Sequence, residues 1–456
     1  MISRRQALLS SLFGAGYVGL RALATGLPVS LLMNPRRALA NMPDAGSSAA
    51  QFVIFMTSGL GDPINASVPG SYIPGVLNTP GGTTTLALGG TTYTASAAWA
   101  QLSSDVLART SFWHIMTNTP IHPKEGDVLK LMDITSSDEM LPSILAKQLA
   151  PVLGTIQTPP ICLGALTPSE GLTFEGQALP IIPPLALADT LTNPAKGNPI
   201  DPDGILTTPL QKLRDQTLNS LYDLYKTGAT PSQQQYIDSL VLSQEQVRSI
   251  NQGLLGNLTS ITDNSANSQI LAAVTLILMG ISPVISIHIP FGGDNHFDAG
   301  LATEESNTFG NQAGVTPSGV ASIAYLMQQL AAASPSLTDR VSFMSLNVFG
   351  RTLASSTSSN GRQHNMNHQV SIAIGKPFKS AVIGGLVGGI DGDFGCMSIN
   401  PTTGAGTTSA SGSVISPVNT LGSFGRTMLA AVGASASTIS SSISGGQVVT
   451  GALAST

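Results

Sequence analysis

Short apolar runs recur along this chain, separated by longer stretches whose apolar residues fall at helical spacing. The first run, Gln51–Met56, is almost wholly apolar and ends in the glycine-containing turn Thr57–Asp62. An uninterrupted apolar run of this length is typical of a strand buried on both faces. The same pattern predicts further strands over residues 108–116, 283–289, 341–348, 369–374 and 381–383.

Two other patterns complete the predicted fold. Threonine-rich segments at 83–88 and 91–94 flank Gly89-Gly90, which predicts a β-hairpin. Strands separated by helices predict an α/β fold with a largely parallel sheet, helices on both faces and the hairpin as a small insertion. The predicted helices cover residues 209–225, 230–252 (with Thr230-Pro231 as its N-cap and N1), 269–279, 316–333 and 417–432.

The N-terminus reads as an export signal. Arg4 and Arg5 precede a weakly apolar stretch, and Ala38–Ala40 supplies an A-x-A cleavage site. This order predicts recognition by the twin-arginine export machinery and a periplasmic or secreted protein; an ordinary amphipathic helix is the alternative. Glycines and Arg21 interrupt the segment well short of the ~20 apolar residues that a membrane span needs, so no membrane anchor is expected.

Removing the predicted signal changes the charge of the chain. The whole sequence has a net charge of −5, and residues 1–40 hold five arginines and no acid. The remainder therefore carries 15 basic against 25 acidic residues, a net charge of −10. No basic block or Lys/Arg stripe occurs, which excludes a nucleic-acid-binding protein.

We divide the chain into a signal peptide (1–40), an α/β domain (41–395) and a Gly/Ser/Thr-rich C-terminal segment (396–456). That last segment holds one helix and either packs on the main domain or trails from it. The two cysteines, Cys162 and Cys396, could pair in an oxidising compartment or remain two buried thiols.

Scarce polar residues gather where predicted strands end. Because open α/β sheets bind ligands outside the carboxyl ends of their strands, these side chains form a candidate site. Asp-x-His and His-x3-His spacings could supply metal ligands, although loop histidines also bond backbone groups. His114 and His288 lie inside apolar runs and are expected to be structural. The candidates are Asp62, His122, Asp294, His296, Arg351, His364 and His368.

Five segments resemble, in order, motifs of the domain-of-unknown-function 1501 family. These bacterial proteins, commonly exported by the twin-arginine route, belong to the alkaline phosphatase and sulfatase-like superfamily. The similar segments span most of the chain after the signal. They are Phe55–Asn65 (Phe-Leu-Arg-Gly-Gly-x-Asp-Gly-Leu-Asn in the family), Asn118–His122 (Asn-Arg-Ser-His), Gly292–His296 (Gly-Gly-Trp/Phe-Asp-Thr-His), Asn347–Thr352 (Ser-Glu-Phe-Gly-Arg-Thr), and Arg362–His364 with His368 (Asp-His-Gly and a later histidine).

The resemblance implies an alkaline-phosphatase-like fold and a hydrolase of phosphate or sulfate esters with one or two divalent metals (zinc, manganese or calcium). It assigns Asp294, His296 and His368 to one metal and Asp62 and His364 to the other. Arg351 would lie near the anion and His122 in the catalytic machinery. A hydroxyl would be the nucleophile, with Thr119 or Thr117 as a displaced substitute.

Three positions depart from the family pattern. A carboxylate of the family is Gln363 here, another is Val348, and the hydroxyl beside His122 is replaced by Ile121. Clustered cations need anionic ligands, so we expect at most one metal, at Asp294, His296 and His368. Two functions remain open: a metal-dependent ester hydrolase, and a non-catalytic secreted or envelope protein with a binding or structural role on the same fold.

Overall fold

The computed structural model describes residues 50–164, 171–192, 257–309, 318–354, 360–409 and 414–454, with a few positions between 216 and 234. The predicted signal peptide, most of the two predicted helices at 209–225 and 230–252, and the start of the one at 316–333 lie outside these ranges. Among the described residues, no helix has both the length and the apolar content to cross a membrane.

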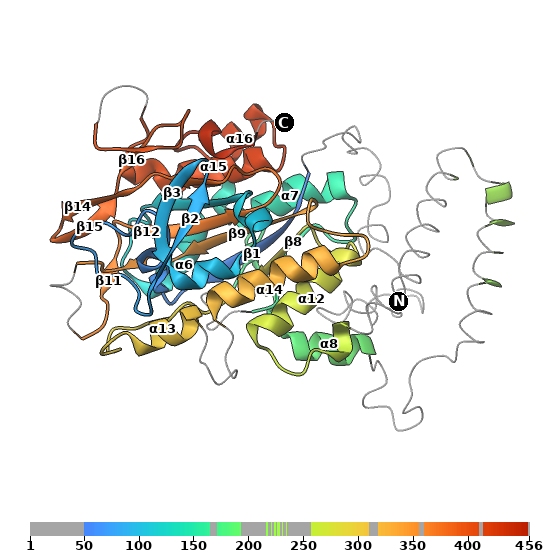
Figure 1. Cartoon of the computed structure of the whole chain (residues 1–456). Helices are drawn as coiled ribbons and strands as arrows, with labels where there is room; N and C mark the ends of the chain where they lie inside the picture. The colour runs from blue at the N-terminus through green and yellow to red at the C-terminus, as the bar shows by residue number, and fades with distance from the viewer. Residues whose placement is uncertain are drawn as a thin grey trace, which may run out of the picture.

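A seven-stranded sheet forms the centre of the molecule (Figure 1). Six strands run parallel to one another, and β12 alone runs against its neighbours β4 and β9. The expected α/β fold with a mostly parallel sheet is therefore confirmed, although the sheet is mixed. In spatial order the strands are β13 (Ala381–Ile383), β4 (Thr110–Ile115), β12 (Gln369–Ile374), β9 (Val341–Asn347), β1 (Phe52–Ser58), β8 (Val284–Ile287) and β5 (Ile161–Cys162).

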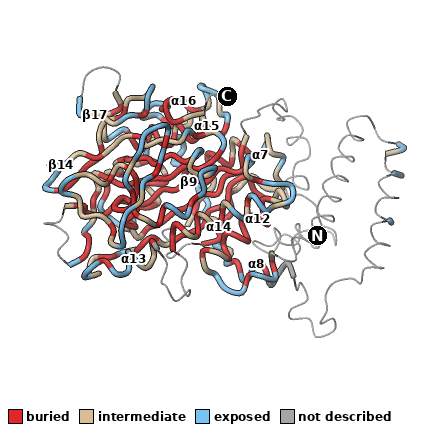
Figure 2. The backbone as a smooth tube through the Cα atoms, in the orientation of Figure 1, coloured by how far each residue is buried: buried red, intermediate tan, exposed pale blue. Residues whose placement is uncertain are grey.

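Strand β1, which lies between β9 and β8, is buried along its whole length because both faces of the sheet are covered. Its side chains alternate between two hydrophobic cores, with Ile54 and Met56 in one and Val53 and Phe55 in the other. This arrangement explains why the strand reads as a continuous apolar run and not as alternation. Buried backbone accordingly fills the middle of the molecule in Figure 2.

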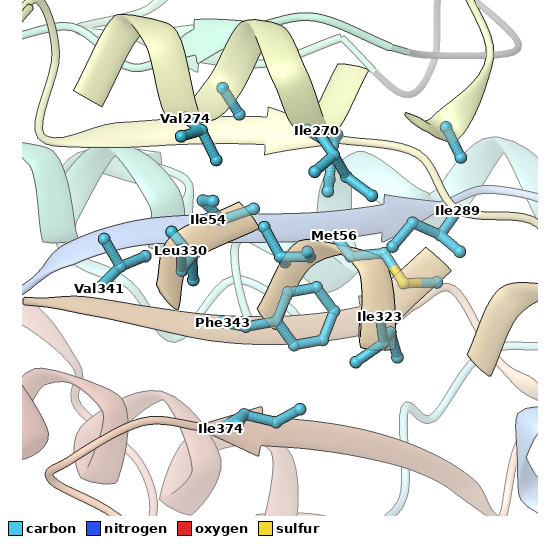
Figure 3. Packing of buried hydrophobic residues seen from close by; sticks show 14 of the residues in the cluster. Ile54, Met56, Ile270, Val274, Ile289, Ile323, Leu330, Val341, Phe343 and Ile374 are labelled. Atoms are coloured by element: carbon cyan, nitrogen blue, oxygen red, sulfur yellow. The ribbon is translucent and has the colours of Figure 1, made fainter. Parts of the chain in front are cut away.

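Helices cover both faces. Helices α8 (Pro184–Thr192), α12 (Ala266–Leu278) and α14 (Gly319–Ala332) contribute to the core that contains Ile54. Figure 3 shows Ile270 and Val274 of α12 and Ile323 and Leu330 of α14 around this core. The other core takes side chains from α7 (Leu141–Leu153), α15 (Thr420–Ala431) and α16 (Ala436–Ser442).

The predicted hairpin is confirmed as β2 (Thr83–Leu88) and β3 (Thr91–Ser96). Gly89 and Gly90 occupy its two turn positions with φ of +57° and +83°, values that suit the tight two-residue turn of a hairpin. Leu86 and Leu88 bury their side chains in the core that contains Ile54, so the hairpin is anchored to the domain.

Short elements connect these layers or lie at the edge of the sheet. The strands are β6 (Thr173–Phe174), β7 (Gln177–Ala178), β10 (Gly350–Arg351), β11 (His364–Asn365), β14 (Leu386–Ile390), β15 (Asp393–Cys396), β16 (Ser398–Ile399) and β17 (Gly406–Thr407). The helical turns are η1 (Pro63–Ala66), η2 (Ala97–Gln101), α5 (Ser104–Leu107), η3 (His122–Lys124), α6 (Glu125–Leu129), η4 (Ser136–Asp138), α13 (Ala302–Phe309), η7 (Pro417–Asn419) and η8 (Thr450–Ala452).

The C-terminal segment packs against the sheet. Phe424 of α15 is fully buried and meets the Trp113 ring of β4 edge to face, with centroids 5.5 Å apart. Ile443 and Val449, beyond α15, are also fully buried in the same core. The described part of residues 396–456 thus contributes side chains to the same core as the sheet. Cys162 and Cys396 are both buried, and no disulfide joins them.

Candidate metal centre

Loops at the carboxyl edge of the sheet carry the candidate residues. His122 begins η3 after β4, while Asp294 and His296 lie in the loop after β8. His364 lies on β11, which precedes β12. Because β12 runs opposite to the other strands, the segment that leads into it lies at the edge where the parallel strands end. The reversed strand thus explains how His364 joins residues that follow strands.

Four of these residues form one compact group. His122, Asp294, His296 and His364 each offer a ligand atom, and those atoms all lie within 4.8 Å of one another. The Nε2 atoms of His296 and His364 are 2.6 Å apart. The Asp294 carboxylate lies 3.3 Å from His296 Nε2 through Oδ1 and 3.5 Å from His122 Nε2 through Oδ2. Three imidazoles and one carboxylate therefore converge on a common point.

The opposite nitrogen of each ring is held by an oxygen. His122 Nδ1 donates to the Gly59 carbonyl at 2.7 Å, and His364 Nδ1 donates to the Pro120 carbonyl at 2.5 Å. His296 Nδ1 donates to the Gln363 side-chain oxygen at 2.8 Å. A carbonyl oxygen only accepts hydrogen bonds, so each Nδ1 carries a proton, and in the neutral form of each ring the lone pair is on Nε2. All three lone pairs belong to the nitrogens that converge.

Two of these Nε2 atoms lie close enough to share a cation, either a proton or a metal ion. When both rings are neutral and carry their proton on Nδ1, His296 and His364 have no N–H to share across the 2.6 Å between their Nε2 atoms. The pKa of His364 is lowered from 6.5 to about 4, chiefly by burial and also by the positive charge of Arg351, while the hydrogen bond to Pro120 acts in the opposite direction. His364 is therefore neutral at pH 7. A metal ion bound by both nitrogens would relieve the repulsion.

Arg351 holds the carboxylate of the group. Its buried guanidinium donates from Nη2 to Asp294 Oδ1 at 2.8 Å. Burial disfavours the charged form of Asp294, but the charge and hydrogen bond of Arg351 outweigh it and hold the pKa of this carboxyl below its ordinary value. Other N–H groups of Arg351 donate to the carbonyls of Leu60, Gly61 and Arg362. Four of its five N–H groups are thus used inside the protein.

The aromatic ring of Phe349 forms an apolar support for the histidines. Its centroid lies 4.2 Å from that of His364 and 4.9 Å from that of His122, and Phe349 itself is fully buried. Packing and Nδ1 hydrogen bonds together leave the two rings little freedom to turn. A site whose ligands are oriented before the ion arrives loses less entropy on binding.

The other predicted site residues lie outside this group. Asp62 is buried, and its Oδ1 accepts hydrogen bonds from the backbone of Phe291 and Gly293 at 3.1 and 3.0 Å, which fixes the turn before Asp294. Thr119 is also buried, and no group of potential ligands among the described residues includes it. Of the five residues predicted as metal ligands, Asp294, His296 and His364 are brought together, and His122 joins them.

His368 is part of a different arrangement. It is fully buried, its Nε2 lies 2.9 Å from His114 Nδ1, and its Nδ1 lies 3.3 Å from Asn65 Nδ2. His114 Nε2 in turn donates to the Pro69 carbonyl at 2.9 Å. Burial lowers the pKa of both histidines, that of His114 to about 4. Both ring nitrogens of His368 therefore face protein partners and not the converging group.

The structure also shows where the three residues that depart from the family pattern lie. Gln363 is exposed to solvent and accepts a hydrogen bond from His296, so the neutral amide orients one of the candidate ligands. Val348 is fully buried in the apolar core, where a carboxylate would have no solvent. Ile121 is 51% exposed next to His122.

The structure contains a buried ion pair next to the site that the sequence did not predict. Glu304 of α13 binds Arg362 through two contacts of 2.7 and 3.2 Å, and both side chains are almost wholly inaccessible. Glu304 also accepts from Asn295 Nδ2 at 3.1 Å. No local pattern marks Glu304, which lies in a short acidic stretch that resembles an ordinary exposed helix start. The one feature of the sequence that could have pointed to the ion pair is the position of its other partner, because Arg362 lies two residues before the candidate ligand His364.

Comparison with protein families, with curated proteins and with solved structures gives no match for this chain. Its description therefore rests on its own geometry: an α/β protein with a His/Asp group that could hold a metal ion.

Proposed function

We propose that this chain binds one divalent transition-metal ion through His122, Asp294, His296 and His364. The observation that carries the proposal is the fixed tautomer of all three histidines. Each donates Nδ1–H to an oxygen and directs Nε2, the nitrogen that has the lone pair in the neutral ring, at the same point. Histidine ligands of protein metals commonly have such an outer partner, which sets the ring orientation and raises ligand basicity.

Zinc fits this donor set best among the three metals implied by the sequence. Three imidazole nitrogens and one carboxylate oxygen are common zinc ligands, usually four in number. Calcium takes six to eight oxygen ligands, and manganese also favours oxygen-rich sites. The described residues contain one such group, which supports a single ion in place of the two implied by the family pattern.

The activity that we propose is hydrolysis of phosphate or sulfate esters after export by the twin-arginine route, on a fold distantly related to the alkaline phosphatase and sulfatase-like superfamily. A bound metal would polarise the ester and lower the pKa of a water molecule. The group is open enough for an ester to reach it, since the side chain of Asp294 is 42% exposed and that of His122 is 30% exposed. Arg351 holds the Asp294 carboxylate in its charged form. Water is favoured over Thr119 as nucleophile because that threonine is buried.

A second candidate is a non-catalytic, exported metal-binding protein. Four protein ligands complete a tetrahedral zinc site, whereas catalytic zinc sites usually have three and leave one position open. The presence of Asp294 beside the three histidines favours this alternative. It differs from the first in one measurable respect, because a closed site binds zinc without hydrolysing any ester.

Metal content separates these proposals. The full chain purified after export should hold about one zinc per chain, and His296→Ala should hold less than about 0.1, because the site loses a ligand. Asp105→Ala, which removes an exposed carboxylate far along the chain from the group, is the control and should retain zinc. Absence of metal from the wild type would refute both proposals. Hydrolysis of an aryl phosphate or aryl sulfate that disappears in His296→Ala would support the enzyme, and zinc binding without hydrolysis would support the alternative.

A further inference from the structure

An exposed phenyl ring stands beside the proposed metal site. Phe297 is 93% exposed, the most of any large apolar side chain in the described part of the chain. Its ring centroid lies 6.1 Å from that of His296, one of the four proposed ligands. The ring is therefore accessible to a molecule that reaches the site, and covering it with an apolar group would remove apolar surface from water.

A second exposed apolar side chain lies next to another ligand. Ile121 is 51% exposed, and it lies between Pro120, whose carbonyl binds His364 Nδ1, and the ligand His122. Only seven large apolar side chains are exposed among the described residues, and two of them directly adjoin proposed ligands. Ile121 and Phe297 thus offer exposed apolar surface next to two of the proposed ligands.

In the described part of these loops, no arginine or lysine side chain is available to bind a second anionic group of a ligand. Arg351 is fully buried and donates four of its five N–H groups within the protein. Lys124, two residues after His122, is paired with Asp127 at 2.6 Å. With three neutral histidines and one carboxylate, a divalent ion leaves the site a charge of about +1. That charge attracts one anionic group of a ligand and does not compensate a second one.

We infer that the proposed site takes esters whose one anionic group meets the metal and whose remaining part is an uncharged aromatic group that packs on Phe297 and Ile121. This inference rests on the metal site proposed above and narrows its substrate class. Phosphate or sulfate esters of aromatic alcohols fit it. Nucleotides, polyphosphates and sugar phosphates do not, because their further charges or hydroxyl groups would meet apolar side chains.

Binding of two matched phosphonates to the zinc-loaded full chain tests the inference. Phenylphosphonate and methylphosphonate carry the same metal-binding group and differ only in the apolar substituent. We expect calorimetric titration to give about tenfold tighter binding of phenylphosphonate, since a phenyl group stacked on Phe297 removes apolar surface of both rings from water. Phe297→Ala should bring the two affinities to within about twofold, with the zinc content and the affinity for methylphosphonate unchanged.

Two further variants make the result specific. Phe297→Tyr retains the ring and should preserve most of the preference. Leu185→Ala removes an exposed apolar side chain on α8, away from the proposed ligands, and should leave the preference intact. Equal affinities for the two phosphonates in the wild type, a preference unaltered in Phe297→Ala, or zinc-loaded protein that binds neither probe would overturn the inference while leaving the metal site standing. Failure of the wild type to bind zinc would instead refute the proposed function, and the inference with it.

Discussion

The buried ion pair between Glu304 and Arg362 offers the sharpest test of how this fold positions its candidate site. Glu304 Oε2 lies 2.7 Å from Arg362 Nε and Oε1 lies 3.2 Å from Nη2. The same carboxylate accepts from Asn295, the residue between two proposed ligands. Arg362 donates its backbone N–H to the Asn295 carbonyl at 3.1 Å and lies two residues before His364. The pair therefore ties together the two loops that carry Asp294, His296 and His364.

Replacing Glu304 with glutamine keeps the shape of the side chain and removes its charge. The Arg362 guanidinium, which is fully buried, is then left without a counter-ion. Loss of one partner from a buried pair lowers the free energy of unfolding by about 3–5 kcal/mol. Two hydrogen bonds to a charged group, at about 1.5–3 kcal/mol each, give a similar figure. We expect Glu304→Gln to be destabilised by about 3 kcal/mol, because the amide can retain one of the contacts.

The same substitution should weaken zinc binding, although Glu304 is not one of the proposed ligands. If the two loops separate by a fraction of an ångström, the four ligand atoms no longer converge, and changes behind a metal site typically lower affinity by about 10- to 100-fold. Urea unfolding of the apoprotein measures the first effect. Competition with a chelator of known affinity measures the second, at a urea-free condition where the variant remains folded. The visible spectrum of the cobalt-substituted protein reports whether the coordination geometry itself has changed.

Asp339→Asn is the matched control, since it removes the carboxylate of a solvent-exposed pair with Arg109. Exposed pairs contribute about 0–1 kcal/mol, so stability should barely change and zinc affinity should stay at the wild-type value. The reasoning is refuted if Glu304→Gln unfolds at the wild-type urea concentration. If it loses stability but binds zinc with unchanged affinity and an unchanged cobalt spectrum, the pair supports the fold and has no part in positioning the ligands.

Three further predictions follow from single contacts. Gln363→Leu removes the acceptor of His296 Nδ1–H and should lower zinc affinity about tenfold by chelator competition, whereas an unchanged affinity would show that the ring needs no such partner. Because burial lowers the pKa of His114 to about 4, its contribution to stability is complete above pH 6.5 and declines as the pH falls toward 4. Urea unfolding at pH 7 and pH 4.5 should therefore show a loss of up to about 3 kcal/mol in the wild type that is smaller in His114→Gln; equal losses would contradict the assignment. Phe343→Ala, in the fully buried centre of β9, should lower the free energy of unfolding by about 3–5 kcal/mol, and a loss under 1 kcal/mol would mean that the two cores are not as closely packed as described.

Several parts of the fold could be read from the chain because they depend on local pattern. The apolar runs at 51–56 and 341–348 became β1 and β9, and two consecutive glycines marked the turn of the hairpin. The reversed direction of β12 could not be read in this way. Strand direction depends on which neighbour a strand pairs with, and a buried strand has the same composition whichever way it runs.

Residue types and their order along the chain determined that His122, Asp294, His296 and His364 would follow or precede strands, and thus that they would reach one edge of the sheet. Only the tertiary structure decided which of the candidates share a site. His364 and His368 are four residues apart, yet the first turns its Nε2 toward the group and the second bonds to His114 inside the protein. Asp62 likewise binds backbone N–H groups and not the common point. A sequence specifies which donors are available, but the distances and ring orientations that make a metal site arise from contacts between loops that lie between 63 and 244 residues apart.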